Sequence, residues 1–140
     1  MTEPLPDKGS AWSRYVGGVY YEGSAGFGRL YLDVKEHHTN KDGSVHGGVI
    51  ASLMDSAVGA ALHNLFRDQP DVTGYSSVEM NVSFLRGARM GDRLTAEARI
   101  IKEGKTLAVA DVDVLSPSGE LAAKGRLTYC VFRGARESER

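Results

Sequence analysis

The first half of the chain contains one segment whose hydrophobic residues repeat at helical spacing. Between 47 and 65, apolar side chains recur every three or four positions, which predicts one long α-helix. These positions are Val49, Ile50, Leu53, Met54, Ala57, Val58, Ala61, Leu62 and Leu65. The segment opens on Gly47 and Gly48 and carries a single formal charge, on Asp55. The pattern predicts a core helix that contains one unusual carboxylate.

The side of this helix opposite its apolar arc is polar but uncharged. This side consists of Ser52, Ser56, Gly59 and His63. A helix at a protein surface normally carries Lys and Glu on that side. We therefore expect the helix to be buried nearly all round, with its small residues packed against a sheet or a second subunit.

Strict alternation of apolar and polar residues follows in the segment 77–84. Val78, Met80, Val82 and Phe84 alternate with polar residues, which predicts a strand with one face buried. Ser77 falls on the polar face of this strand in the same register.

Other segments show the same alternation or are rich in residues that favour strands. The expected strands span 18–21, 29–34, 94–100, 108–114 and 121–132. Turns at 103–105 and 116–119 make the last three antiparallel neighbours. Two strands, one helix and four strands predict an α+β fold, one curved antiparallel sheet wrapped around the helix. No linker divides the chain, so we expect a single domain over 1–140, with 1–10 as a loose lead-in.

Composition narrows the classes of function. The 140 residues include 17 basic and 18 acidic ones, so the chain has no general attraction for nucleic acid or for anionic membranes. The lone Cys130 excludes an intrachain disulfide, and no signal peptide or membrane span is recognisable, so a cytoplasmic location is expected. His37, His38 and His46 lack a cysteine or carboxylate at ligand spacing. We therefore expect no metal and no cofactor.

Asp55 and the glycine pair each allow a structural and a functional explanation. An aspartate inside an apolar helix is either satisfied by a nearby polar group or held as a base or nucleophile. Gly47 and Gly48 alone would indicate only a flexible strand-to-helix turn. A helix N-terminus also exposes N–H groups that stabilise negative charge. An oxyanion donor and a carboxylate are together the two halves of an acyl-transfer site.

These two halves cannot serve one carbonyl within a single chain. The helical rise from Gly47 to Asp55 is about 12 Å, at roughly 1.5 Å per residue. A two-fold dimer removes the difficulty if the helix start of one subunit faces the middle of the helix in the other. The sequence therefore predicts a homodimer with shared active sites.

The array N…G…HGG…D within 38–62, followed by the segment 77–114, resembles the hotdog-fold acyl-CoA thioesterases of the PaaI type, named for phenylacetate degradation. The resemblance covers about 18–132. It implies a six-stranded antiparallel sheet around one long central helix. It also implies hydrolysis of an acyl-CoA thioester to free acid and coenzyme A, and association of two dimers into a homotetramer.

By this resemblance, five residues match catalytic positions of the family. The Gly47 amide polarises the thioester carbonyl, and His46 helps to position it. Asp55, from the opposite subunit, is the general base or nucleophile. Asn40 helps to hold the thioester or the attacking water, and Ser77 hydrogen-bonds the water or the carboxylate. Gly87 stands where many relatives carry proline, and Gly59 stands where some carry a hydroxyl, so water orientation falls to Ser77.

Basic residues near strand ends suggest where coenzyme A binds. The candidate substrate-binding residues are Gly48, Arg86, Arg89 and Lys105. The guanidinium and ammonium groups of the last three are suited to binding phosphates. A solvated basic rim is the simpler explanation of the three cations. An alternative function is a non-catalytic acyl-CoA binding or metabolite-sensing module of the same fold. The acyl group itself, aryl or aliphatic, stays open.

Overall fold

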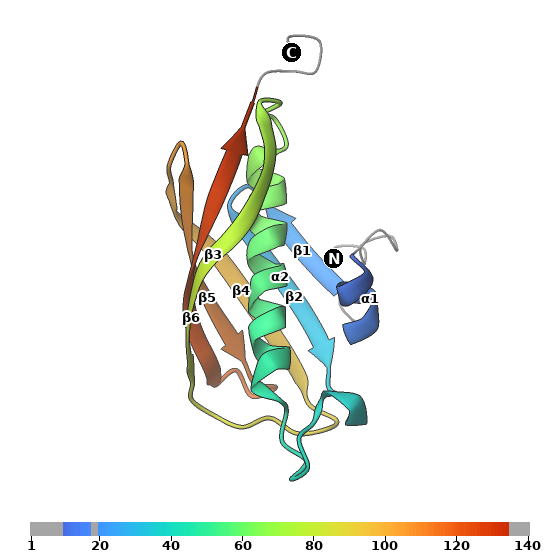
Figure 1. Ribbon diagram of the computed structural model, residues 1–140. Helices are drawn as coiled ribbons and strands as arrows, with labels where there is room; N and C mark the ends of the chain where they lie inside the picture. The colour runs from blue at the N-terminus through green and yellow to red at the C-terminus, as the bar shows by residue number, and fades with distance from the viewer. Residues whose placement is uncertain (1–9, 18–19, 135–140) are drawn as a thin grey trace.

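A single antiparallel sheet curves around one long helix in the computed structural model, which describes residues 10–17 and 20–134 (Figure 1). In chain order the elements are α1 (Ala11–Val16), β1 (Tyr20–Ser24), β2 (Phe27–Asp33), a 3₁₀ turn (Glu36–His38), α2 (Gly47–Phe66), β3 (Val72–Phe84), β4 (Arg93–Glu103), β5 (Leu107–Leu115) and β6 (Leu121–Arg133). The predicted α+β fold is confirmed. Of the expected strand 18–21, positions 18 and 19 lie outside the described residues.

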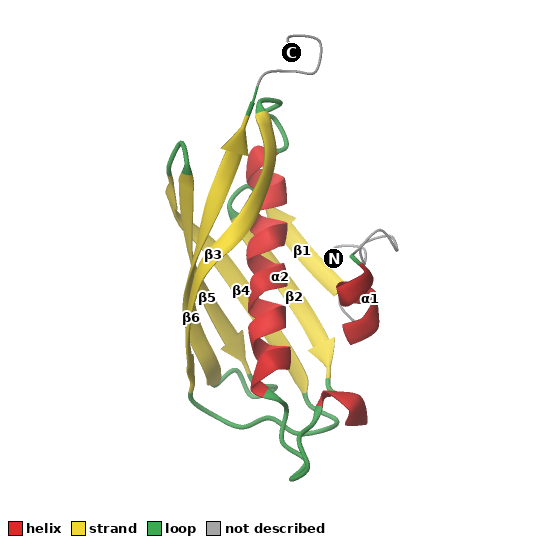
Figure 2. Ribbon diagram, in the orientation of Figure 1, coloured by secondary structure: helices red, strands yellow, loops and turns green. Residues whose placement is uncertain are grey.

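The six strands lie in the order β1-β2-β4-β5-β6-β3, and every neighbouring pair is antiparallel. Short hairpins join β1 to β2, β4 to β5 and β5 to β6. Between β2 and β3 the chain passes through α2, so that β3 joins the sheet at the edge opposite β1 (Figure 2). β1 and β3 are therefore the two edge strands, and β3 is paired along one side only, with β6.

Helix α2 packs directly on the concave face of the sheet. Eight of its residues are buried: Ile50, Leu53, Met54, Ala57, Val58, Ala61, Leu62 and Phe66. Gly28 of β2 lets the helix backbone approach the strand closely, because a Cβ there would lie 2.5 Å from the carbonyl oxygen of Ala57 and 2.9 Å from the amide nitrogen of Ala61. By length and composition alone α2 would also suffice to cross a membrane, but here it forms the core.

The remaining side of α2 is open in the single chain. Gly48 and His63 are exposed, and Ser52, Ser56 and Gly59 are half-buried. A Cβ at Gly59 would meet nothing within 4 Å. The prediction that the helix is buried nearly all round is therefore wrong for one chain, because the sheet covers only one side of it.

The apolar face predicted for the segment 77–84 is also uncovered. Val78 is 60% exposed, Met80 38% and Phe84 56%, and only Val82 is half-buried. The prediction that this face is buried is wrong for the single chain. The physical reason is that α2 packs mainly on β2 and β4, so that the helix leaves most of this face of β3 uncovered.

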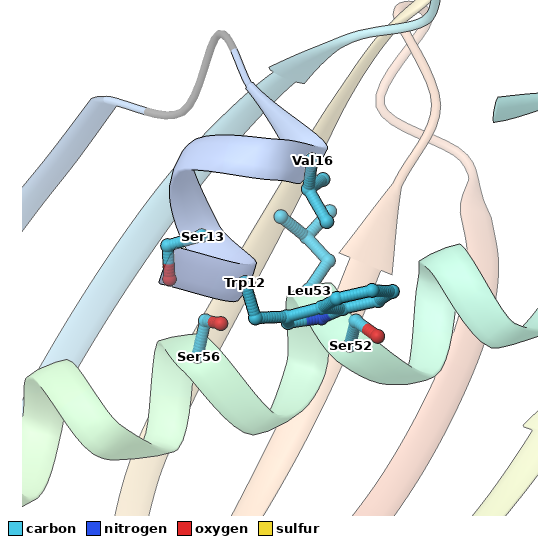
Figure 3. Close-up of a pocket in the computed structure, with 6 residues that line it drawn as sticks. All are labelled: Trp12, Ser13, Val16, Ser52, Leu53 and Ser56. Carbon is cyan, nitrogen blue, oxygen red and sulfur yellow. The ribbon is translucent and has the colours of Figure 1, made fainter. Parts of the chain in front are cut away.

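Helix α1 was not predicted by the alternation of apolar and polar residues. Its N-cap is Ser10, whose hydroxyl accepts a hydrogen bond from the Ser13 amide at 3.1 Å. Figure 3 shows α1 resting on α2, with the Trp12 ring beside Ser52 and with Ser13 close to Ser56 around a small pocket. α1 thus flanks the open side of α2 along one border.

Candidate active site

The N-terminus of α2 follows a loop that the surrounding elements hold firmly. Thr39 and Val45 form an isolated antiparallel bridge. The Val45 amide donates to the Ala88 carbonyl at 2.8 Å, and the His46 amide donates to the His38 carbonyl at 2.8 Å. These bonds tie the loop to the connection that follows β3 and to the turn that follows β2. The start of α2 is thereby fixed in position.

His46 is the N-cap of α2, and its side chain is exposed. Its ring nitrogen Nδ1 accepts a hydrogen bond from the Gly48 amide at 2.8 Å. A neutral imidazole carries its proton on the other nitrogen when Nδ1 is an acceptor. The geometry therefore assigns the proton to Nε2, which is available to donate to a ligand at the helix start.

The Gly47 amide is the unpaired donor at this helix end. His46 caps the next residue, Gly48, and the Val49 amide donates to the His46 carbonyl at 2.9 Å. Within the described part of the chain, no acceptor faces the Gly47 N–H. A helix-terminal N–H without a partner stabilises a developing oxyanion. This observation agrees with the role predicted for Gly47.

Asn40 lies in the same loop, six residues before the N-cap His46. Its side-chain amide donates to the Ser44 hydroxyl at 3.2 Å and approaches the Val45 carbonyl at 3.5 Å. Its backbone amide donates to the Ser44 carbonyl at 2.7 Å. The side chain is exposed beside the start of α2. The structure therefore brings Asn40, His46 and Gly47 together as one half-site.

Asp55 belongs to a second half-site in the middle of α2. Its side chain is half-buried, and its carboxylate oxygen Oδ1 accepts a hydrogen bond from the hydroxyl of Tyr129. Tyr129 is 5% exposed and also lies 3.1 Å from the Asp55 carbonyl oxygen. Burial, and then the hydrogen bond to Asp55, raise the pKa of Tyr129 far above its usual range. Sequence reasoning missed Tyr129, since a tyrosine in an apolar strand gives no local sign of its partner.

Ser77 lies beside this second half-site because of a β-bulge. It pairs with Tyr129, whereas Glu79, two residues later, pairs with Thr128, the next residue of β6. The extra residue Val78 reverses the alternation of faces. The prediction that Ser77 shares the polar face of Glu79 is therefore wrong: Ser77 lies on the helix side of the sheet with Tyr129.

The two half-sites do not meet in one chain. They lie on one continuous helix, and Gly47 and Asp55 are about 12 Å apart along its axis. Both residues are half-buried. The ring of Phe84, from the edge strand β3, would lie 3.3 Å from a Cβ at Gly47. The start of α2 and the exposed face of β3 therefore form one continuous surface.

The candidate coenzyme A residues do not all lie near one half-site. Arg89 is next to the loop before α2, where its guanidinium donates to the Asp42 carbonyl at 3.3 Å. Arg86 pairs with Glu120, and both are exposed. Lys105 lies in the β4–β5 turn at the opposite end of the sheet from the α2 N-terminus (Figure 1). The Gly48 amide donates a hydrogen bond to Nδ1 of His46. Among the described residues, no cluster of three or more metal-binding side chains occurs.

Comparisons with known proteins decide the family. Residues 42–123 match the sequence profile of the Thioesterase superfamily. The chain belongs to the Thioesterase superfamily. The predicted hotdog-fold thioesterase is thereby confirmed, and the chain is an enzyme of this class.

Relatives within the Thioesterase superfamily are similar over most of the chain. Acyl-coenzyme A thioesterase 13 of Mus musculus is 43% identical over 98 residues, which cover 69% of this chain and 67% of that protein. The same enzyme of Homo sapiens is 39% identical over 98 residues, with the same coverage. The solved structure of zebra fish Thioesterase Superfamily Member 2 is 31% identical, with a TM-score of 0.77 and 89% of each chain covered. Escherichia coli PaaI, at 24% identity, shares the fold with a TM-score of 0.80 over 90% of this chain and 87% of its own.

Proposed function

We propose that this chain hydrolyses an acyl-CoA thioester to a free acid and coenzyme A. The observation that carries the proposal is the pair of half-sites on α2, an unpaired Gly47 amide at the N-terminus and the Asp55 carboxylate on the open side. An oxyanion donor and a base or nucleophile are what hydrolysis of a thioester requires. The 43% identical acyl-coenzyme A thioesterase 13 of the mouse supports the substrate class.

The proposed chemistry uses both half-sites on one carbonyl group. As a general base, Asp55 takes a proton from water, and the water oxygen attacks the thioester carbon. The carbonyl oxygen becomes an oxyanion that accepts a hydrogen bond from the Gly47 amide, with the His46 Nε2–H beside it. The C–S bond then breaks, and the proton on Asp55 passes to the thiolate sulfur of coenzyme A. As a nucleophile, Asp55 would attack the same carbon with the same oxyanion donor, and the C–S bond would break to release the thiolate of coenzyme A. Water would then hydrolyse the resulting mixed anhydride to the free acid and restore Asp55.

We further propose that the working unit is a homodimer, in which Gly47 of one subunit faces Asp55 of the other. The support is geometric, since the two groups are about 12 Å apart on one helix. The uncovered apolar face of β3 and the open side of α2 are the surfaces that a second copy would bury. A tetramer formed by two such dimers remains a prediction from the family resemblance.

Arg86 and Arg89 are our candidates for the coenzyme A phosphates, with Gly48 at the helix start nearby. Two thioesterase-fold structures, one with coenzyme A from Streptococcus pneumoniae and one with acetyl CoA from Streptococcus mutans, bind such ligands themselves. Lys105 is far from Gly47 in the same chain. In a dimer whose two α2 helices run antiparallel, Lys105 of one subunit would lie nearer the N-terminus of α2 in the other.

The direct test is steady-state hydrolysis of a panel of aryl and aliphatic acyl-CoA thioesters, followed with a thiol-trapping reagent. Replacing Asp55 by asparagine removes the base or nucleophile but keeps the shape of the side chain. We expect kcat to fall roughly a hundredfold or more. Tight acyl-CoA binding by the unmodified protein without any thiol release would support the non-catalytic binding module. Full turnover by a folded Asp55→Asn protein would reject the role of Asp55.

A further inference from the structure

The hydroxyl of Tyr129 reaches Asp55 from the strand beneath α2. It donates to Oδ1 of the carboxylate and lies 3.1 Å from the carbonyl oxygen of the same residue. The other carboxylate oxygen, Oδ2, has no partner among the described residues. Nor is Asp55 part of any ion pair within the described ranges, so Tyr129 is the group that orients it there.

We propose that Tyr129 is a positioning residue, which holds Oδ1 of Asp55 so that Oδ2 is presented to the water or the thioester. This inference rests on the proposed function, because it assigns a role within the same site. A carboxylate on a helix can otherwise rotate about its terminal torsion, which has broad energy wells. A fixed donor on one oxygen restricts this rotation.

Tyr129 is itself held rigidly, as a positioning residue must be. It is almost fully buried in β6, between the buried residues Leu127 and Val131 on the same face. The ring of Tyr75 packs beside it with centroids 6.2 Å apart, and Phe66 packs on Tyr75 at 6.0 Å. The donor therefore cannot turn away without disturbing an aromatic cluster.

The surroundings of this pair keep the Tyr129 hydroxyl protonated, so that it remains a hydrogen-bond donor. Tyr75 from β3 and Ser77, the cross-strand neighbour of Tyr129, share its side of the sheet. The pKa of Tyr129 is raised by burial and by the hydrogen bond with Asp55. Its hydroxyl therefore keeps its proton near neutral pH and remains a hydrogen-bond donor to Asp55.

Tyr75 provides a matched control. Its hydroxyl also points to α2, where it donates to the carbonyl oxygen of Gly59 at 3.4 Å, one turn after Asp55. It belongs to the same aromatic cluster but does not touch the carboxylate. Tyr75→Phe thus removes one hydrogen bond from a tyrosine to the helix backbone and leaves the orientation of Asp55 untouched. Tyr129→Phe removes the hydrogen bond to the helix backbone and the hydrogen bond to the Asp55 carboxylate together.

The experiment compares Tyr129→Phe and Tyr75→Phe with the unmodified protein by two readouts. The first is steady-state hydrolysis of acyl-CoA, with kcat and KM separated. The second is the carbon-13 NMR resonance of the Asp55 carboxyl, assigned by its absence from Asp55→Asn. For Tyr129→Phe we expect kcat to fall about tenfold at unchanged KM, as for one lost hydrogen bond to a charged group. The Asp55 resonance should also shift, whereas Tyr75→Phe should change neither kcat nor this resonance.

The two readouts separate failure of this inference from failure of the proposed function. An unmoved Asp55 resonance in Tyr129→Phe would overturn the positioning role, whatever the activity. Equal losses of kcat in both variants would also overturn it, because the tyrosines would then only anchor the helix. If the unmodified protein hydrolyses no acyl-CoA, the proposed function fails. A resonance that moves only in Tyr129→Phe would still establish that Tyr129 orients the carboxylate.

Discussion

Ser77 of β3 and Tyr129 of β6 are direct cross-strand neighbours on the helix side of the sheet. The β-bulge at Val78 creates this relationship, since regular alternation would place Ser77 on the outer face with Glu79. The bulge therefore brings a hydroxyl to the side of the sheet on which Asp55 lies. Bulges that re-aim a side chain are over-represented next to active sites.

The first prediction concerns Ser77 as a hydrogen-bonding partner of the water or of the Asp55 carboxylate. Ser77→Ala should lower kcat about tenfold, as for a lost hydrogen bond to a charged group, and should leave stability nearly unchanged because the side chain is exposed. Steady-state kinetics and thermal unfolding measure the two effects. Ser76→Ala is the matched control, because Ser76 is also exposed but pairs with Cys130 on the other face. Equal effects of the two substitutions would argue against a role for the re-aimed hydroxyl.

The second prediction concerns the exposed face of β3 as the dimer surface. A charge in an edge strand opposes pairing with another strand. Val78→Lys should therefore convert the dimer to monomers, measured by light scattering after size exclusion, and activity should be lost with it. Ile101→Lys is the control, because Ile101 is 51% exposed, close to the 60% of Val78, but lies in β4 away from that edge. A monomeric Ile101→Lys with a dimeric Val78→Lys would place the interface elsewhere.

The third prediction concerns the contact of α2 with the sheet. Gly28→Ala would place a Cβ 2.5 Å from the Ala57 carbonyl oxygen, and backbone on both sides leaves no room to adjust. Such overpacking should lower the free energy of unfolding by about 1–3 kcal/mol. Denaturant titration measures the loss. Gly87→Ala, where an added Cβ meets nothing within 4 Å, should be close to neutral. An unchanged free energy of unfolding in Gly28→Ala would mean that α2 does not pack on β2 as closely as in this structure.

Local patterns were enough to predict most of the fold. Helical spacing predicted a helix over 47–65, and the structure has Gly47–Phe66. Alternation predicted the strands and hairpins of the second half, and their order follows from short connections. Helix α1 was missed because six residues are too few to show a helical period.

Burial and long-range contacts were beyond the reach of local patterns. The apolar face of β3 and the small-residue side of α2 were both expected to be covered. Among the described residues, only α1 borders that side of α2, and most of the apolar face of β3 is exposed. Alternation of residue types also cannot reveal a bulge, so the face of Ser77 was predicted wrongly. The bond between Tyr129 and Asp55 joins residues 74 positions apart, and neither residue carries a local mark of the other.

The central claim is that Gly47 of one subunit and Asp55 of the other form one active site. Gly47→Pro removes the amide donor with little damage to the fold. Proline is well suited to the first residue of a helix, and His46 before it already has an extended backbone, with φ −63° and ψ 133°. Asp55→Asn removes the carboxylate. Each variant alone should be inactive, since every site in it lacks one half.

Mixing equal amounts of Asp55→Asn and Gly47→Pro, after subunit exchange, tests this claim most directly. Half of the dimers are then mixed, and one of the two sites in each mixed dimer contains both an intact amide and an intact carboxylate. Hydrolysis of acyl-CoA should return to about a quarter of the activity of the unmodified protein. Activity that stays at zero after exchange has been demonstrated, or a fully active monomer, would contradict the shared site.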